Sequence, residues 1–129
     1  MPTIFVSAVD LPADPASLLH DADRLLVEDF SIAAGMLARS ALEAHLKLLC
    51  QQHGCEPPLK ELRRSCKEAY LGHLKRAGIL DRAGELEGTR LFELGSRIIH
   101  CEVLDTVSID TLLQDVRRFV ETVGNRGDL

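Results

Sequence analysis

The segment from Ser31 to His53 most constrains what this chain can fold into. Its apolar residues fall on several faces of a helix: Ile32, Ala33, Met36, Leu37, Ala41, Leu42, Leu46, Leu48 and Leu49. A helix that is apolar nearly all round is buried among other elements. We therefore predict a central helix over residues 31–53, ended by Gly54.

Amphipathic segments on both sides of this helix predict the elements that cover it. Apolar residues recur at helical spacing in residues 16–27, 59–77, 81–100 and 109–123. The predicted fold class is all-α, an up-and-down bundle of four to five helices with a short extended N-terminal arm. The expected boundaries are the arm at residues 1–15, the bundle at 16–124 and a polar C-terminal tail at 125–129.

Individual residues mark the expected ends of these helices. Capping residues and glycines predict starts at Asp14 with Pro15 and at Ser108, and ends at Gly78 and Gly124. We expect a break in the 59–77 helix near Leu71-Gly72. Glycine destabilises the interior of a helix. We therefore predict that Gly95 lies where another backbone passes closely.

The composition disfavours several classes of function. A net charge of −5 argues against a general attraction to nucleic acid, and one Tyr with no Trp argues against stacking platforms for single strands. No apolar run approaches the length that spans a bilayer. The N-terminus lacks the basic and long apolar regions of a secretory signal. We therefore expect the four cysteines to be reduced thiols in the cytoplasm.

His100 is the first candidate functional residue. It is expected near a helix C-terminus, where the helix dipole favours imidazolium, one turn after Arg97. A charged histidine can transfer protons or bind phosphate, with Arg97 supplying further positive charge. The alternative is that His100 caps the helix end by bonding to Glu102 or to a backbone carbonyl.

Arg39 and Glu43 lie one turn apart inside the central helix. A charge in such an apolar setting needs a partner or a function. At this spacing the two side chains can pair, and a buried pair fixes helix packing more readily than it catalyses a reaction. The structural role is favoured. The alternative is that Arg39 binds RNA or a nucleotide and that Glu43 orients a basic side chain.

Basic side chains gather in residues 59–77. Lys60, Arg63 or Arg64, and Lys67 share one face if this segment is a single helix. Such a stripe suits the phosphates of RNA or of a nucleotide, so Lys60, Arg64 and Lys67 are candidate binding residues. The alternative is a solvated face of an acidic protein.

No spacing in the chain predicts a metal or cofactor site. Cys50, His53 and Cys55 lie close together, but the Cys-x2-Cys pairs typical of zinc sites are missing. There is no Gly-rich phosphate loop and no nucleophile elbow. We therefore expect no metal and no cofactor, with the cysteines acting as small buried hydrophobes.

Two segments together resemble HEPN-type domains. They are AAGMLARSALEAHLKLLCQQHG, from Ala33 to Gly54, and GSRIIH, from Gly95 to His100. The resemblance is narrower to the bacterial domain-of-unknown-function branch of that superfamily. Its members often have an Ala-rich helix with Arg and Glu one turn apart, then a Gly-Asn pair and a histidine four residues after the Asn. Here Gly95 and His100 match, and Ser96 stands where Asn is usual.

The resemblance covers roughly residues 16–123 and implies a helical bundle that often dimerises. Catalytic members are metal-independent endoribonucleases with an Arg, four to six residues and then a His, in a cleft between subunits. This chain has Glu93, Leu94 and Gly95 at the corresponding positions. The resemblance therefore implies a homodimer that binds RNA or a nucleotide with a degenerate nuclease motif. The alternatives are a non-enzymatic protein-interaction or scaffold domain, and an active toxin-like endoribonuclease.

Overall fold

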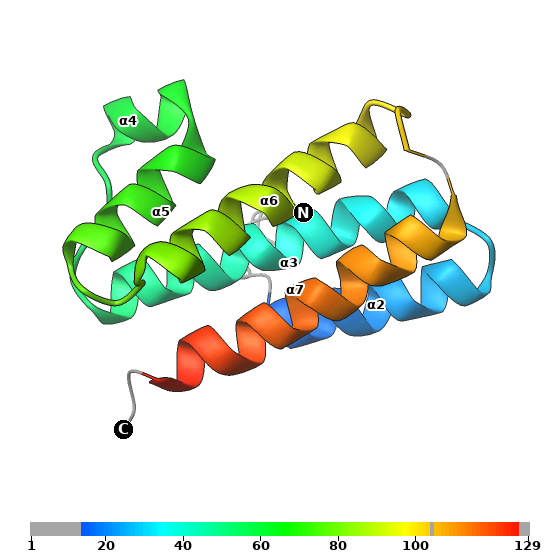
Figure 1. Cartoon of the computed structure of the whole chain (residues 1–129), viewed down its shortest axis with the longest axis horizontal. Helices are drawn as coiled ribbons and strands as arrows, with labels where there is room; N and C mark the ends of the chain where they lie inside the picture. The colour runs from blue at the N-terminus through cyan, green and yellow to red at the C-terminus, as the bar shows by residue number, and fades with distance from the viewer. Residues whose placement is uncertain (1–13, 104, 127–129) are drawn as a thin grey trace, which may run out of the picture.

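The computed structural model of the chain describes residues 14–103 and 105–126, with side chains up to residue 123. Its six helices are α2 (Pro15–Val27), α3 (Ser31–Gln52), α4 (Leu59–Arg64), α5 (Cys66–Arg76), α6 (Arg82–Ile99) and α7 (Thr106–Arg126) (Figure 1). Within the described ranges there is no strand, which confirms the all-α class. The predicted extended arm falls on residues 1–13, outside the described residues.

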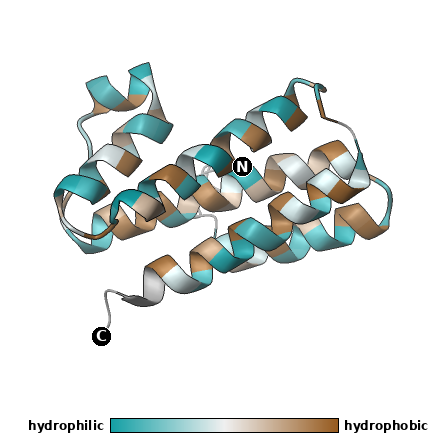
Figure 2. Ribbon diagram, viewed as in Figure 1, coloured by the Kyte–Doolittle hydropathy of each residue, from teal (hydrophilic) through white to brown (hydrophobic). Residues whose placement is uncertain are grey.

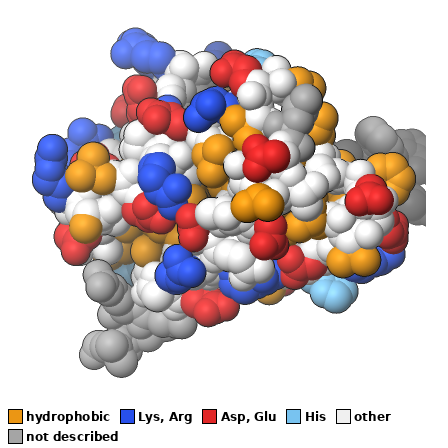
Figure 3. Space-filling model, turned by 45° about the vertical axis from the view of Figure 1, so that its right-hand side comes forward, with side chains coloured by type: hydrophobic (Ala, Val, Ile, Leu, Met, Phe, Trp, Pro, Cys, Tyr) orange, Lys and Arg blue, Asp and Glu red, His pale blue; other side chains and the backbone are white. Residues whose placement is uncertain are grey.

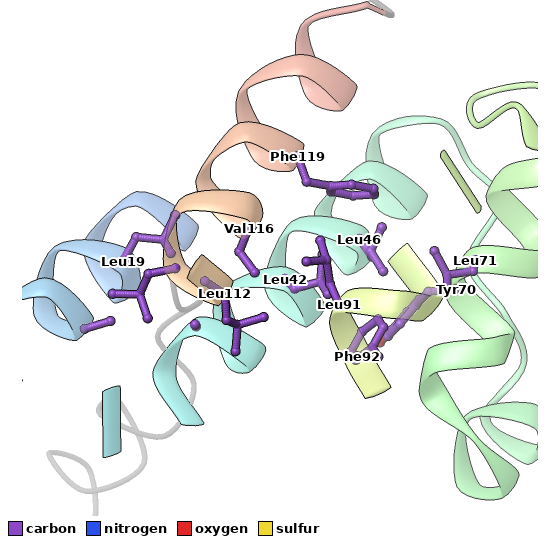
Figure 4. Close-up of a cluster of buried hydrophobic side chains, with 14 of the residues drawn as sticks. Leu19, Leu42, Leu46, Tyr70, Leu71, Leu91, Phe92, Leu112, Val116 and Phe119 are labelled. Atoms are coloured by element: carbon purple, nitrogen blue, oxygen red, sulfur yellow. The ribbon is translucent and has the colours of Figure 1, made fainter. Parts of the chain in front are cut away.

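Helix α3 is the centre of the structure, as its all-round apolar pattern predicts. It contacts α2, α5, α6 and α7, whereas the short α4 packs on α5 at one end of the molecule. Along α6 and α7, hydrophobic and hydrophilic residues alternate with helical spacing (Figure 2). Their hydrophobic faces meet α3 in a core that includes Leu42, Leu46, Leu91, Phe92 and Leu112 (Figure 4).

Two glycines bring α6 close to its neighbours. A Cβ atom on Gly35 of α3 would lie 2.6 Å from Cγ2 of Ile98, and one on Gly88 of α6 would lie 2.7 Å from Cδ2 of Leu71 in α5. Real Cβ atoms do not approach other carbons so closely, so a larger residue at either position would force the neighbouring side chain to shift. Gly95 has a different neighbour from the one predicted: the side chain of Arg39, instead of another backbone, lies 3.1 Å from its ideal Cβ position.

Helices α2, α3, α5 and α6 all end in the same hydrogen-bonded turn, a Schellman motif. In each one, a backbone N–H bonds to the carbonyl five residues earlier, with N–O distances of 2.8 to 3.0 Å. The donor and acceptor residues are Phe30 with Leu25, Cys55 with Cys50, Ile79 with Leu74, and Glu102 with Arg97. The residue before each donor has a positive φ: Asp29 (68°), Gly54 (65°), Gly78 (79°) and Cys101 (60°). The helix ends predicted at Gly54 and Gly78 are therefore confirmed.

Cys101 holds a left-handed backbone conformation that costs an L-residue about 1 kcal/mol relative to glycine. We expect Cys101→Gly to raise the free energy of unfolding by about 1 kcal/mol, measured by urea denaturation under reducing conditions. Gly54→Ala is the matched control at the equivalent position of α3, and it should lower the same quantity by a similar amount. Equal stability of the three proteins would contradict this account of the turns.

The prediction of a single helix over residues 59–77 is wrong at Ser65. This residue is extended, with φ −165° and ψ 104°, and separates α4 from α5. Its hydroxyl accepts a hydrogen bond from the backbone N–H of Glu68 at 3.4 Å and so caps α5. Serine competes for backbone groups in this way and can end a helix without a Gly or Pro. The predicted break at Leu71-Gly72 is also wrong, since both residues lie inside α5.

The last helix begins and ends beyond its predicted limits. Its cap is Asp105 and not Ser108, because the Asp105 carboxylate accepts a hydrogen bond from the Ser108 N–H at 2.8 Å. The hydrogen bond from Ser108 lowers the pKa of Asp105. Helix α7 continues through Gly124 to Arg126. At the other end of the bundle, the predicted start is confirmed: Asp14 caps α2, and Pro15 is its first residue.

Candidate functional site

The candidate site residues do not meet at one place. His100 and Arg97 lie at the C-terminal end of α6, and Arg39 and Glu43 lie on α3. Lys60, Arg64 and Lys67 lie on α4 and α5, at the end of the molecule remote from the α6 C-terminus (Figure 1). From Gly88, which packs on α5, to His100 is twelve residues, or roughly 18 Å along a helix.

His100 is the C-cap residue of α6, and its side chain is exposed. Among the described residues, its ring makes no hydrogen bond and no ion pair. The residue that faces Glu102 is Arg97, whose Nε lies 4.0 Å from Oε1 of Glu102 across the Schellman turn. Both of these side chains are more than half exposed, so this pair is weak. His100 is therefore open to solvent and is not held in place by a partner.

Arg39 and Glu43 are half-buried on α3 but are not paired with each other. The guanidinium carbon of Arg39 lies 5.3 Å from the centre of the Phe92 ring, and its aliphatic stem crosses α6 at Gly95. Arg39 Nε is buried without a hydrogen-bond partner in the described structure. The arginine is thus fixed by packing and by its contact with an aromatic face.

Glu43 has a partner that the sequence did not suggest. Its Oε1 accepts a hydrogen bond from the thiol of Cys66 on α5, at 3.0 Å. Burial, and then this hydrogen bond, raise the pKa of the Cys66 thiol, while burial and the Glu43 charge raise the pKa of Tyr70. Glu43 therefore joins α3 to α5, which supports a structural role for this carboxylate.

Helices α4 and α5 form the most basic part of the molecule, named here the basic lobe (residues 59–76). It has six cations, Lys60, Arg63, Arg64, Lys67, Lys75 and Arg76, and two carboxylates, Glu61 and Glu68. The whole chain has 15 Lys and Arg against 20 Asp and Glu, so the remainder has nine cations and eighteen carboxylates. Lys and Arg side chains gather at the left of the space-filling view, where the lobe lies (Figure 3). The lobe is therefore positive on an otherwise acidic protein.

The cations of the basic lobe are free of carboxylates. Within the described residues, none of the six forms an ion pair or a side-chain hydrogen bond. Glu61, which could have neutralised one of them, bonds instead to Nε2 of His73 at 3.0 Å and joins α4 to α5. Elsewhere, Arg90, Arg117 and Arg118 each bind a carboxylate.

The break at Ser65 changes the predicted basic stripe. Lys60 and Arg64 lie on α4, whereas Lys67 lies on α5, so they do not share one face of a continuous helix. Lys75 and Arg76 lie outside the predicted stripe and add two cations at the end of α5. The signal that could have found them is the excess of cations over carboxylates across the whole segment, instead of helical spacing within it.

The pocket between α6 and α7 is a poor candidate site. It has a volume of about 220 Å³ and is lined in part by Glu87, Asp115 and Arg118. Arg90 donates to Glu87 at 2.8 and 2.9 Å and to Asp115 at 2.8 Å, and Asp115 also accepts from Arg118 at 3.0 Å. The hydrogen bond from Arg90 is the main cause of the lowered pKa of Glu87. These four side chains bind one another and join α6 to α7.

Comparison with family models, with curated proteins and with solved structures finds no match to this chain. Within the described residues, no group of three or more His, Cys, Asp or Glu side chains is placed to hold a metal ion. None of the described helices combines the length and the hydropathy needed to cross a bilayer. Function is therefore inferred from the chemistry of the surface itself.

Proposed function

We propose that this chain is a HEPN-like helical domain that binds the phosphate backbone of RNA through its basic lobe and does not cleave it. The observation that supports this most is the set of six lobe cations without carboxylate partners. Cations that are already paired would have to give up a carboxylate before they bind a phosphate. Unpaired cations give up only water and counterions when they bind a phosphate. The release of counterions is the main source of sequence-independent affinity for nucleic acid.

The lobe favours recognition of phosphates over recognition of bases. Its single aromatic residue of the Phe, Tyr and Trp class is Tyr70, which is 7% exposed and packs in the core. Sequence-independent binding of unpaired bases usually requires exposed aromatic rings on which the bases stack. Contacts from Lys and Arg to phosphates position an RNA without reading its sequence.

The arrangement around His100 supports binding without cleavage. Cleavage of a phosphodiester without a metal needs one group to transfer protons and a cation to stabilise the charge on the phosphorane. His100 is available for the first task, but Glu93, Leu94 and Gly95 occupy the positions where the HEPN pattern has arginine. Arg97, the cation on α6 that is nearest to His100 in the sequence, lies opposite the carboxylate of Glu102.

The experiment that tests the proposal is the salt dependence of binding to a short fluorescent RNA, followed by fluorescence anisotropy. We expect the triple variant Lys60→Gln, Arg64→Gln and Lys67→Gln to lose three phosphate contacts. The slope of log K against log salt should then become less steep by about 2, with roughly 10- to 100-fold weaker binding at low salt. RNA incubated with wild type and with His100→Ala, without added metal, should stay intact in both cases.

A matched control removes three cations from outside the lobe. Arg24, Arg97 and Arg118 are exposed and lie on α2, α6 and α7, so their change to Gln alters the net charge equally. This control should retain most of the affinity. Equal weakening by both triple variants, or no binding by wild type, would contradict the proposal. Metal-independent cleavage that is lost in His100→Ala would restore the ribonuclease interpretation.

Protein association is the second candidate function, and a separate surface favours it. Val27, Phe30 and Val107 are 84%, 58% and 76% exposed. They belong to the α2–α3 turn and to the start of α7, which lie at the same end of the molecule (Figure 1). Clustered exposed apolar side chains mark interaction surfaces. We propose that a second copy of the chain covers this end, which gives the homodimer that the HEPN resemblance implies, in the reducing cytoplasm.

Sedimentation velocity tests the homodimer. We expect wild type to sediment as a dimer at micromolar concentration and Phe30→Ser to shift at least tenfold toward monomer, because a large apolar contact is lost. Leu86→Ser is the control, since Leu86 is 55% exposed but lies on α6, away from this surface. A wild type that is monomeric, or a Phe30→Ser protein that dimerises as wild type does, would contradict the proposal.

A further inference from the structure

The Schellman motif that ends α3 contains two cysteines at the positions where its side chains meet. The N–H of Cys55 bonds to the carbonyl of Cys50 at 3.0 Å, and the N–H of Gly54 bonds to the carbonyl of Gln51 at 3.4 Å. In this motif, the side chains of the first and last residues come into contact, and the contact is usually hydrophobic. Here the same backbone geometry places two cysteines at the positions of this contact.

Two of the three other helix ends show the usual chemistry of this contact, whereas the end of α6 has Arg97 and Glu102 at these positions. The corresponding residues are Leu25 and Phe30 at the end of α2, and Leu74 and Ile79 at the end of α5. Both pairs are apolar. The α3 pair occupies the same geometry with two residues that can join covalently.

The two thiols differ in their access to solvent. Cys50 is fully buried, whereas Cys55 is partly exposed. Burial is the largest cause that raises the pKa of the Cys50 thiol to about 12, followed by the charge of Cys55 and a hydrogen bond with its side chain. The interaction between the two thiols that raises this pKa fits the side-chain contact typical of the motif. An external reagent therefore reaches Cys55 first, and Cys50 can react only with what is attached to Cys55.

We propose that Cys50 and Cys55 are a redox modification site, which forms an intramolecular disulfide by exchange with a low-molecular-weight disulfide of the glutathione type. The Cys55 thiolate attacks one sulfur of the small disulfide, forms a mixed disulfide and releases one thiolate. The Cys50 thiol then gives up its proton as its sulfur attacks the Cys55 sulfur, and the displaced second thiolate takes up that proton. The protein dithiol is oxidised, and the small disulfide is reduced to two thiols.

The position of the pair makes the second step intramolecular. The turn places the two side chains at its contact positions, so the effective concentration of Cys50 at the mixed disulfide is high even though its thiolate is scarce. The resulting disulfide would join the last turn of α3 to the loop at Cys55. This loop continues through Pro57-Pro58 into the basic lobe. Cys66 and Cys101 have no such arrangement: Cys66 donates to Glu43, and the Cys101 thiol is exposed beside the carbonyl of Ile99.

The test uses the full chain with Cys66→Ser and Cys101→Ser, so that only the proposed pair remains. Incubation with oxidised glutathione, followed by intact-mass analysis, should show a monomer that has lost two hydrogens. Trypsin should release a single peptide, residues 48–60, that contains both cysteines and has lost two hydrogens, and a dithiol reductant should restore the starting mass. In the same background, Cys50→Ala should instead retain a stable glutathione adduct on Cys55, because the second step is removed.

Three outcomes would overturn the proposal. One is a glutathione adduct that persists on Cys55 while Cys50 stays reduced. Another is a covalent dimer through Cys55 in place of the intramolecular bond. The third is full retention of both thiols at a glutathione concentration that modifies the exposed Cys101 of wild type. Circular dichroism of the Cys66→Ser, Cys101→Ser variant establishes that it is folded before these results are interpreted.

Discussion

Replacement of Phe92 by alanine is expected to lower the free energy of unfolding by about 3–5 kcal/mol, measured by urea denaturation. The side chain is 1% exposed and lies where α6 crosses α3, in the same cluster as Leu42 and Leu91 (Figure 4). Its loss leaves a cavity between α6 and the central helix α3. It also removes the ring that faces the guanidinium of Arg39.

A double-mutant cycle separates these two effects. Phe92→Leu fills most of the cavity without an aromatic face, and Arg39→Met keeps the stem of the arginine without its charge. If the cation–π contact contributes, the two changes should be non-additive by about 0.5–1 kcal/mol. Strict additivity would show that the ring stabilises the fold by burial alone.

The central helix and several helix ends could be predicted because their signals are local. Residues 31–52 are apolar nearly all round, and only a helix surrounded by others buries most of such a segment. Asp14 followed by Pro15, and Gly54 after the last apolar turn, define helix ends through backbone chemistry that holds in any fold.

The errors occur where two local signals compete. Asp105 and Ser108 are both good caps, and the sequence alone does not say which one α7 uses. Ser65 interrupts a segment whose apolar spacing continues, so periodicity hides the break. In both cases, apolar spacing and capping preference allow more than one boundary, so neither signal alone decides between them.

The partners of the candidate site residues could not be predicted from local signals either. Helical spacing places Arg39 and Glu43 on one face, and the structure keeps them there, but their partners come from other helices. Phe92 lies 53 residues after Arg39, and Cys66 lies 23 residues after Glu43. The spacing of residues along one helix does not predict partners on another helix. The excess of cations in residues 59–76 needs no tertiary partner, so a count along the sequence is enough to find it.

His45 makes the stability of this protein sensitive to acid. It is 6% exposed, its ring meets Phe119 edge-on at 6.4 Å between ring centres, and its Nε2 has no hydrogen-bond partner in the described structure. Burial lowers its pKa from 6.5 to about 4. The folded state therefore keeps this ring neutral in a pH range where the unfolded chain has already bound a proton.

The sign of the effect follows from proton binding. Above about pH 6.5 both states are neutral at this residue, and His45 contributes no pH dependence. Between pH 6.5 and 4 the unfolded state binds more protons, so the free energy of unfolding should fall by about 3 kcal/mol across this window through His45 alone. Urea denaturation at successive pH values measures this loss.

His45→Leu should remove this part of the acid sensitivity, because the variant has no group to titrate at that position. Near pH 7 it should be as stable as wild type or more stable, since it also removes a buried nitrogen without a partner. His20→Leu, at an exposed position on α2, controls for the loss of a histidine elsewhere. If wild type and His45→Leu lose stability in parallel from pH 6.5 to 4, His45 is not kept neutral by burial, and the acid sensitivity arises from other groups.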